Sequence, residues 1–120
     1  MTVLLIAIGA ALGAPLRYLT DRAVQARHGS VFPWGTLTVN VAGSLLLGAV
    51  AAVPTAPAVG ALVGTGFCGA LTTWSTLSYE TLRLARNGAR RHALANALVS
   101  VVAGLAAASL GYALTRVITG

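Results

Sequence analysis

The chain alternates between long apolar segments and short polar connections. The apolar segments cover about residues 2–19, 35–53, 59–82 and 93–115, and the stretch 29–79 has 51 consecutive positions without Asp, Glu, Lys, Arg or His. An α-helix needs about 20 predominantly apolar residues to cross the hydrocarbon core of a bilayer. The pattern therefore predicts an all-α membrane protein with four transmembrane helices in a single domain, residues 1–120.

The connections predict how these helices are oriented. Pro54 and Pro57 stop the second helix and leave an uncharged turn. The connections 20–34 and 83–92 are charged, and with four spans both lie on one side. Because positively charged short loops stay in the cytoplasm, we expect a multi-pass protein of the cell membrane with both termini outside. The arginines that set this bias are six on the inner side against one on the outer side: Arg22, Arg27, Arg83, Arg86, Arg90 and Arg91 against Arg116.

Composition narrows the class of protein further. Of 120 residues, 57% are hydrophobic and 8% are charged, with a mean hydropathy of +0.83, which is too apolar for a cytosolic enzyme. The eight basic residues are all arginine and give a net charge of +6, but they separate apolar segments instead of forming a patch. No nucleic-acid partner is therefore expected. Cys68 has no second cysteine to pair with, and we expect it to be a small residue in helix packing.

Asn40 is a polar side chain inside the second apolar segment. A polar group in hydrocarbon must find a partner or line a wet cavity. The amide of Asn40 has donors and an acceptor, so it either binds an anion or holds two helices together. From the residue alone, the second interpretation is favoured.

The third apolar segment contains a run of hydroxyl side chains. Residues 72–78 (TTWSTLS) hold five hydroxyls in seven positions, and Gly64, Gly66 and Gly69 precede them. Ser and Thr compete with helix geometry by bonding to the backbone, and glycine loosens the turn. The run is either part of an intact helix or the site of a break near mid-membrane, where freed carbonyls line a cavity or bind a cation. The residues alone slightly favour the intact helix.

Other polar residues also allow two interpretations each. Asn96 and Ser100 lie four apart on one helix face and continue a polar track, or Asn96 makes a helix-end contact. Arg17 either extends its side chain to the membrane interface or forms an electropositive vestibule that attracts anions. Glu80 is expected to pair with Arg83 or Arg17.

The membrane segments lack the residues of an enzyme site. They hold no pair of acids and no histidine for acid–base catalysis or metal binding, so an enzyme is not expected. A small four-helix drug/proton exchanger is a less favoured alternative, because it needs an embedded carboxylate. Small residues at four-residue spacing, as at Gly9 and Gly13 or Gly60 and Gly64, predict close helix packing within one subunit.

Three motifs, in this order, resemble the Fluc/CrcB fluoride channels. They are residues 9–18 (GAALGAPLRY), 35–44 (GTLTVNVAGS) and 66–80 (GFCGALTTWSTLSYE), and their order and spacing match over essentially the whole chain. The resemblance implies a passive, fluoride-selective channel that exports cytoplasmic fluoride. It also implies an antiparallel dimer around a central structural sodium ion that is not transported.

The resemblance implies roles for individual residues as well. Backbone carbonyls of Gly69 and Thr72 from both subunits would hold the sodium ion at a break in the third helix, and this makes the break the favoured interpretation of the hydroxyl run. Asn40 would donate hydrogen bonds to fluoride. The remaining residues implied for the fluoride pathway are Trp74, Ser75, Thr76, Leu77, Asn96 and Ser100, and those for the vestibule are Arg17 and Glu80.

Two pathway positions depart from the family pattern. Trp74 and Leu77 stand where the family has Phe, whose positively polarised ring edge faces the ion path. Trp74 keeps such an edge and Leu77 has none. Together with the arginine bias, this predicts a partner that is a paralogous subunit of opposite orientation. A non-conducting partner subunit of a heterodimeric fluoride channel is an alternative.

Overall fold

The computed structural model describes residues 1–29, 32–54 and 56–119, and these ranges are helical apart from short connections. No strand occurs in them, so the predicted all-α class is confirmed. The elements are α1 (Thr2–His28), α2 (Trp34–Ala51), α3 (Pro57–Val59), the π-helical segment η1 (Gly60–Cys68), α4 (Gly69–Leu71), α5 (Trp74–Arg86) and α6 (Arg90–Thr119).

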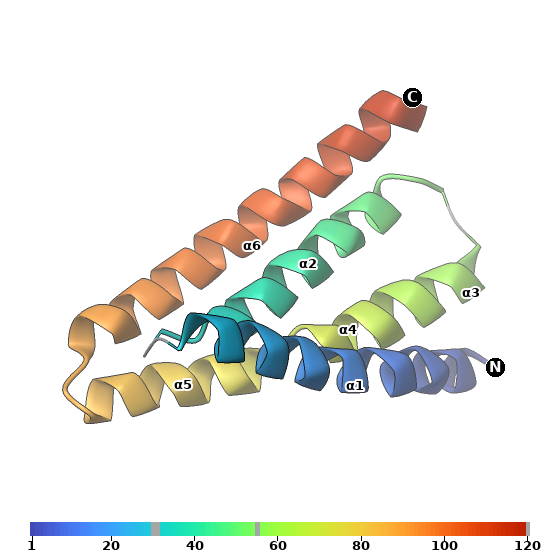
Figure 1. Ribbon diagram of the computed structural model, residues 1–120. Coiled ribbons are helices and arrows are strands. Elements are labelled where there is room, and N and C mark those ends of the chain that lie inside the picture. The colour runs from blue at the N-terminus through green and yellow to red at the C-terminus, as the bar shows by residue number, and fades with distance from the viewer. Residues whose placement is uncertain (30–31, 55, 120) are drawn as a thin grey trace.

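The chain runs back and forth between two ends of the molecule. Both termini, the end of α2 and the start of α3 lie at one end, and the end of α1, the start of α2 and the turn between α5 and α6 lie at the other (Figure 1). Within the described residues α1, α2 and α6 are each long and apolar enough to cross a membrane. The predicted third span, 59–82, is instead a succession of α3, η1, α4 and α5.

Two helices extend further than their apolar segments predict. The connection 20–34 is expected to be a loop, but α1 continues through Asp21 to His28, and Gly29 ends it with φ 53° and an N–H bond to the Gln25 carbonyl of 3.0 Å. In the same way α6 begins at Arg90 and ends at Thr119, so the turn after α5 is only residues 87–89. Charged residues do not stop a helix, and these turns continue beyond the apolar segments that set the expected boundaries.

Helix packing depends on glycines that allow backbones to touch. A Cβ at Gly48 on α2 would collide with the Ala108 carbonyl of α6, and one at Gly9 on α1 would collide with the Leu62 carbonyl of η1. These contacts confirm close packing within one subunit for Gly9. Gly60 differs, because a Cβ there would have nothing within 4 Å.

Polarity is distributed as in a membrane protein. Large apolar side chains such as Leu12, Val102 and Leu105 are more than half exposed, whereas Asn96 is fully buried and Thr36 is 1% exposed. In lipid the apolar exterior needs no cover, and polar groups must meet one another inside the bundle. The fold therefore supports a protein embedded in a membrane.

Candidate functional site

The helical path is interrupted at Thr72 and Thr73. Thr72 has φ −82° and ψ 160°, and Thr73 has φ −153° and ψ 124°, so both residues are extended between α4 and α5. The Thr73 hydroxyl oxygen accepts a 3.1 Å hydrogen bond from the Thr76 N–H and caps the N-terminus of α5. Thr72 donates its hydroxyl to the Cys68 carbonyl at 2.9 Å.

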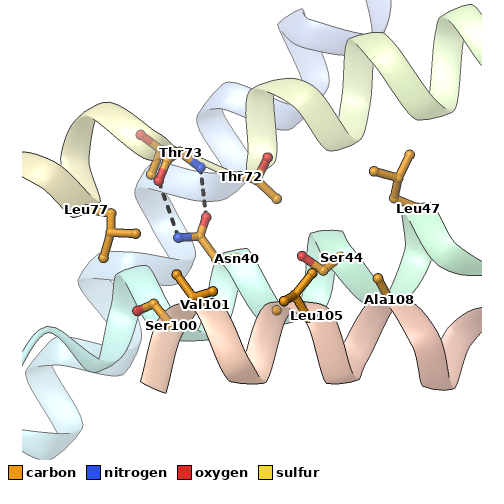
Figure 2. A pocket seen from close by; sticks show the side chains of 11 residues that line it. Asn40, Ser44, Leu47, Thr72, Thr73, Leu77, Ser100, Val101, Leu105 and Ala108 are labelled. Atoms are coloured by element: carbon orange, nitrogen blue, oxygen red, sulfur yellow. Dashed lines mark hydrogen bonds between the residues drawn. The ribbon is translucent and has the colours of Figure 1, made fainter. Parts of the chain in front are cut away.

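Asn40 holds the interruption through the backbone of Thr73 (Figure 2). Its Oδ1 accepts from the Thr73 N–H at 2.7 Å, and its Nδ2 donates to the Thr73 carbonyl at 3.3 Å. One amide therefore binds both backbone polar groups of the N-cap residue of α5, whose N–H has no helical acceptor. The interpretation that Asn40 holds two helices together matches this geometry, and one N–H of Nδ2 has no acceptor among the described residues.

The interruption frees the carbonyls of Gly69 and Thr72 from their helical donors. In a continuous α-helix the Gly69 carbonyl accepts from the Thr73 N–H and the Thr72 carbonyl from the Thr76 N–H. Here the Thr73 N–H donates to Asn40 and the Thr76 N–H to the Thr73 hydroxyl. These are the two carbonyls that the family resemblance implies as sodium ligands, and carbonyl oxygen is a ligand that hard cations prefer.

A cavity of about 310 Å³ lies between α2, α6 and the interruption. It brings together three of the residues predicted for the pathway, Asn40, Leu77 and Ser100. Leu77 is 7% exposed, so it contributes an apolar wall in the place of an aromatic ring edge. The residues with polar side chains that line the cavity are Asn40, Ser44, Thr72, Thr73 and Ser100.

Asn96 and Ser100 form a buried polar chain with Thr81. Asn96 Nδ2 donates to the Thr81 hydroxyl at 2.9 Å, and the Ser100 hydroxyl donates to Asn96 Oδ1 at 3.4 Å. Asn96 is therefore a contact between α5 and α6 and not a helix-end cap, because α6 begins six residues earlier at Arg90. Sequence reasoning missed Thr81, whose only signal was a hydroxyl inside an amphipathic helix.

A smaller cavity of about 160 Å³ lies on the other side of the interruption, between α1, α2 and α5. Arg17, Asp21, Thr36, Thr73 and Thr76 contribute its polar lining. The cavity thus brings Arg17, predicted for the vestibule, together with Thr76, predicted for the pathway.

Glu80 and Ser75 lie outside the two cavities beside the interruption. Glu80 accepts a 2.6 Å hydrogen bond from the Thr36 hydroxyl, and the positive charge of Arg83, one of its two expected partners, also acts on its carboxylate. Thr36 is buried on the facing helix and was not anticipated as the partner. Ser75 is exposed and lines neither of the two cavities, and the side chain of Trp74 lies outside the described residues.

Comparison with known proteins gives a consistent family. Residues 4–112 match the family described as "CrcB-like protein, Camphor Resistance (CrcB)". The chain is 60% identical to "Fluoride-specific ion channel FluC 1" of Frankia casuarinae, with 100% of each chain covered. It is 57% identical to the protein of the same name from Streptomyces avermitilis, covering 92% of this chain and 93% of the relative. It is 49% identical to "Fluoride-specific ion channel FluC 2" of Rhodococcus jostii, covering 96% and 99%.

Proposed function

The chain belongs to the CrcB family, whose relatives above are named as ion channels and not as enzymes, and from this premise we propose that it is a subunit of a passive, fluoride-selective channel of the cell membrane. The observation that carries the proposal is the cluster of polar groups at the interruption. Asn40, Thr73 and Ser100 line one cavity beside an apolar wall that includes Leu77.

The cluster suits an anion that is small and strongly hydrated. Such an ion leaves water only where donors are closely placed to replace its hydration shell. The second N–H of Asn40 Nδ2, which has no acceptor among the described residues, is such a donor. Arg17, in the smaller cavity, supplies positive charge at the inner entrance.

The direction of transport follows from the chemistry of fluoride. Neutral HF crosses the bilayer and dissociates in the cytoplasm. The interior-negative potential then drives the anion out through a passive pore, because each unit charge gains about 2.3 kcal/mol per 100 mV. The channel therefore exports fluoride without an energy source of its own.

A structural sodium ion at the interruption is part of the proposal. The carbonyls of Gly69 and Thr72 would hold it, and their loss of helical donors supports this role. The proposed site takes these two oxygens from each chain, so a second subunit would supply the others. The sodium ion would neutralise converging carbonyl dipoles near mid-membrane and fix the interruption in both subunits.

The second subunit is proposed to be antiparallel and paralogous. Six arginines flank the inner connections against one at the outer end, which leaves little of the inverted form that an antiparallel homodimer needs. The printed names of the relatives, FluC 1 in one organism and FluC 2 in another, support the existence of numbered paralogues. Both termini of this chain would face the outside.

Leu77 favours a second candidate function, that of a non-conducting partner subunit. Its buried side chain lines the cavity where the family has an aromatic ring. A partner with intact aromatic positions would then carry the conducting pathway, and this chain would complete the dimer.

Growth in fluoride tests the channel proposal. Bacteria that lack fluoride export would express this chain together with its four-span paralogue of opposite charge bias. The proposal predicts that they grow at fluoride concentrations that arrest cells carrying the empty vector. It also predicts that cells that express the paralogue with the Asn40→Asp variant of this chain do not grow at these concentrations. Arrest of all strains at the same concentration would contradict the channel proposal, and equal rescue by the Asn40→Asp pair would favour the non-conducting role.

A further inference from the structure

The two cavities beside the helix interruption meet at one residue. Among the described residues, Thr73 alone lines both the 310 Å³ cavity with Asn40 and Ser100 and the 160 Å³ cavity with Arg17 and Thr76. Its side chain is half-buried, and in Figure 2 it lies beside the amide of Asn40. Any ion that passes from the arginine side to the Asn40 side has Thr73 in the intervening wall.

Hydrogen bonding leaves the Thr73 hydroxyl with an unused proton. The oxygen accepts the Thr76 N–H through a lone pair, and no acceptor for its own O–H exists among the described residues. Three neighbouring hydroxyls already donate within the protein: Thr36 to Glu80, Thr72 to the Cys68 carbonyl, and Ser100 to Asn96. The hydroxyls of Ser44 and Thr76 also lack an acceptor among the described residues, but each lines only one of the two cavities.

The backbone of Thr73 is held in place by Asn40. Because both its N–H and its carbonyl bind the same amide, the residue cannot rotate without breaking two hydrogen bonds. The Thr73 O–H and the second Asn40 N–H, neither of which has an acceptor among the described residues, therefore belong to two residues that are hydrogen-bonded to each other. A fixed pair of donors is what an anion needs when it leaves water.

We propose that the Thr73 hydroxyl donates a hydrogen bond to fluoride at the junction of the two cavities, and so acts as a selectivity-determining residue of the permeation path. The proposal rests on the channel function argued above. The Thr73 hydroxyl then has two roles: its oxygen caps the N-terminus of α5, and its proton is donated to fluoride.

Three substitutions of Thr73 distinguish the capping role of the oxygen from the donor role of the proton. Thr73→Ser keeps the capping oxygen and the proton. Thr73→Asp keeps a capping oxygen, which is favoured at a helix N-terminus, but at neutral pH has no proton to donate. Thr73→Val has neither. Thr38→Val is the matched control, since Thr38 is exposed and its hydroxyl donates to the Trp34 carbonyl of its own helix.

Each variant is co-expressed with the paralogue, purified as a dimer and reconstituted into liposomes, with thermal unfolding and fluoride efflux measured on the same sample. We expect Thr73→Ser and Thr38→Val to conduct within about threefold of the wild type. We expect Thr73→Asp and Thr73→Val to conduct at least tenfold less, although Thr73→Asp unfolds near the wild-type temperature. If fluoride efflux instead correlates with unfolding temperature across the variants, so that Thr73→Asp conducts like Thr73→Ser, the proposal is overturned and Thr73 acts only as a helix cap. A wild-type dimer without fluoride efflux would instead refute the channel function itself.

Discussion

Single polar side chains in this protein satisfy backbone N–H groups that the helix interruption leaves without helical acceptors. Asn40 accepts from the N–H of Thr73, and the Thr73 hydroxyl accepts from the N–H of Thr76. An unsatisfied polar group in a lipid environment costs several kcal/mol, so these bonds stabilise a backbone that would otherwise stay helical.

Replacement of Asn40 by Asp should reduce both folding stability and fluoride flux. The carboxylate keeps an acceptor for the Thr73 N–H but faces the Thr73 carbonyl with a second oxygen, so the hydrogen bond from Nδ2 is lost at a cost of about 0.5–1.5 kcal/mol. Its negative charge also repels the permeant anion. We expect fluoride efflux from liposomes to fall at least tenfold.

The same chemical change outside the two cavities beside the interruption is the control for Asn40. Asn87→Asp lies in the turn after α5 and should leave flux near the wild-type value. Wild-type flux in Asn40→Asp would remove Asn40 from the ion path.

The proposed cation site predicts unequal effects at its two residues. Thr72→Ser keeps the hydroxyl that donates to Cys68 and loses only a methyl group packed against Gly43, so folding and flux should change little. Gly69→Leu should be severe for the dimer and mild for the single chain, because a Cβ at Gly69 has nothing within 4 Å in one subunit.

Dimer content and thermal stability at graded sodium concentrations check this pair of variants. We expect added sodium to raise the unfolding temperature of the wild-type dimer and of Thr72→Ser, and to have no effect on Gly69→Leu. Equal behaviour of the two variants would argue against carbonyl coordination at this position.

Sequence reasoning did not predict the hydrogen-bond partners of the polar residues in the site. Asn40 was recognised as polar in an apolar segment, but its partner Thr73 is 33 positions away. Thr36 lies 44 positions from Glu80, and Thr81 lies 15 from Asn96. Helix packing sets these pairs, and no local spacing encodes them. Sequence reasoning could name Arg17 and Asn40 because motifs that carry the family resemblance include them. It could name Ser100 because this residue lies on the same helix face as Asn96.

At the scale of helices, the lengths of the apolar segments predicted the membrane-crossing helices well but the first and last residues of those helices poorly. The segments 35–53 and 93–115 correspond to α2 and α6, since burial in lipid requires continuous apolar sequence. The continuation of α1 to His28 was not predictable from polarity, because Asp and Arg are tolerated in a helix that extends past the hydrocarbon.

The contact between α2 and α6 predicts a strong dependence on one glycine. A side chain at Gly48 would collide with the Ala108 carbonyl, so Gly48→Val should lower the free energy of unfolding by about 1–3 kcal/mol. Gly60 has open space, and Gly60→Ala should be neutral or stabilise the chain by about 0.5–1 kcal/mol.

Unfolding in mixed micelles with increasing SDS, followed by tryptophan fluorescence, measures both glycine variants. Equal unfolding curves for Gly48→Val and the wild type would show that α2 and α6 do not approach as closely as described.

At the scale of the whole molecule, the two ends differ in charge. Six arginines lie at one end of the molecule, in the last turns of α1 and α5 and in the first turn of α6, whereas Arg116 lies near the C-terminus at the other end. A tag on the C-terminus should therefore be reached only from outside intact cells. Detection of the tag on both faces would contradict a fixed orientation.

A charge-balanced variant extends this test. Changing Arg27, Arg86, Arg90 and Arg91 to Gln leaves Arg22 and Arg83 against Arg116. We expect C-termini on both faces, and antiparallel homodimers in the absence of a paralogue. If this variant also remains in one orientation, the arginine bias is not what sets the need for a partner.

The measurement that tests the channel function most directly is ion release from liposomes that contain this chain with its paralogue of opposite bias. The vesicles are loaded with equal fluoride and chloride, a potassium ionophore is added to set an outward driving force, and each anion is followed with its own electrode. The account predicts rapid fluoride release with chloride retained, and fluoride release at least tenfold slower when this chain carries Asn40→Asp. Fluoride release no faster than from protein-free vesicles, or equal release of the two anions, would contradict it.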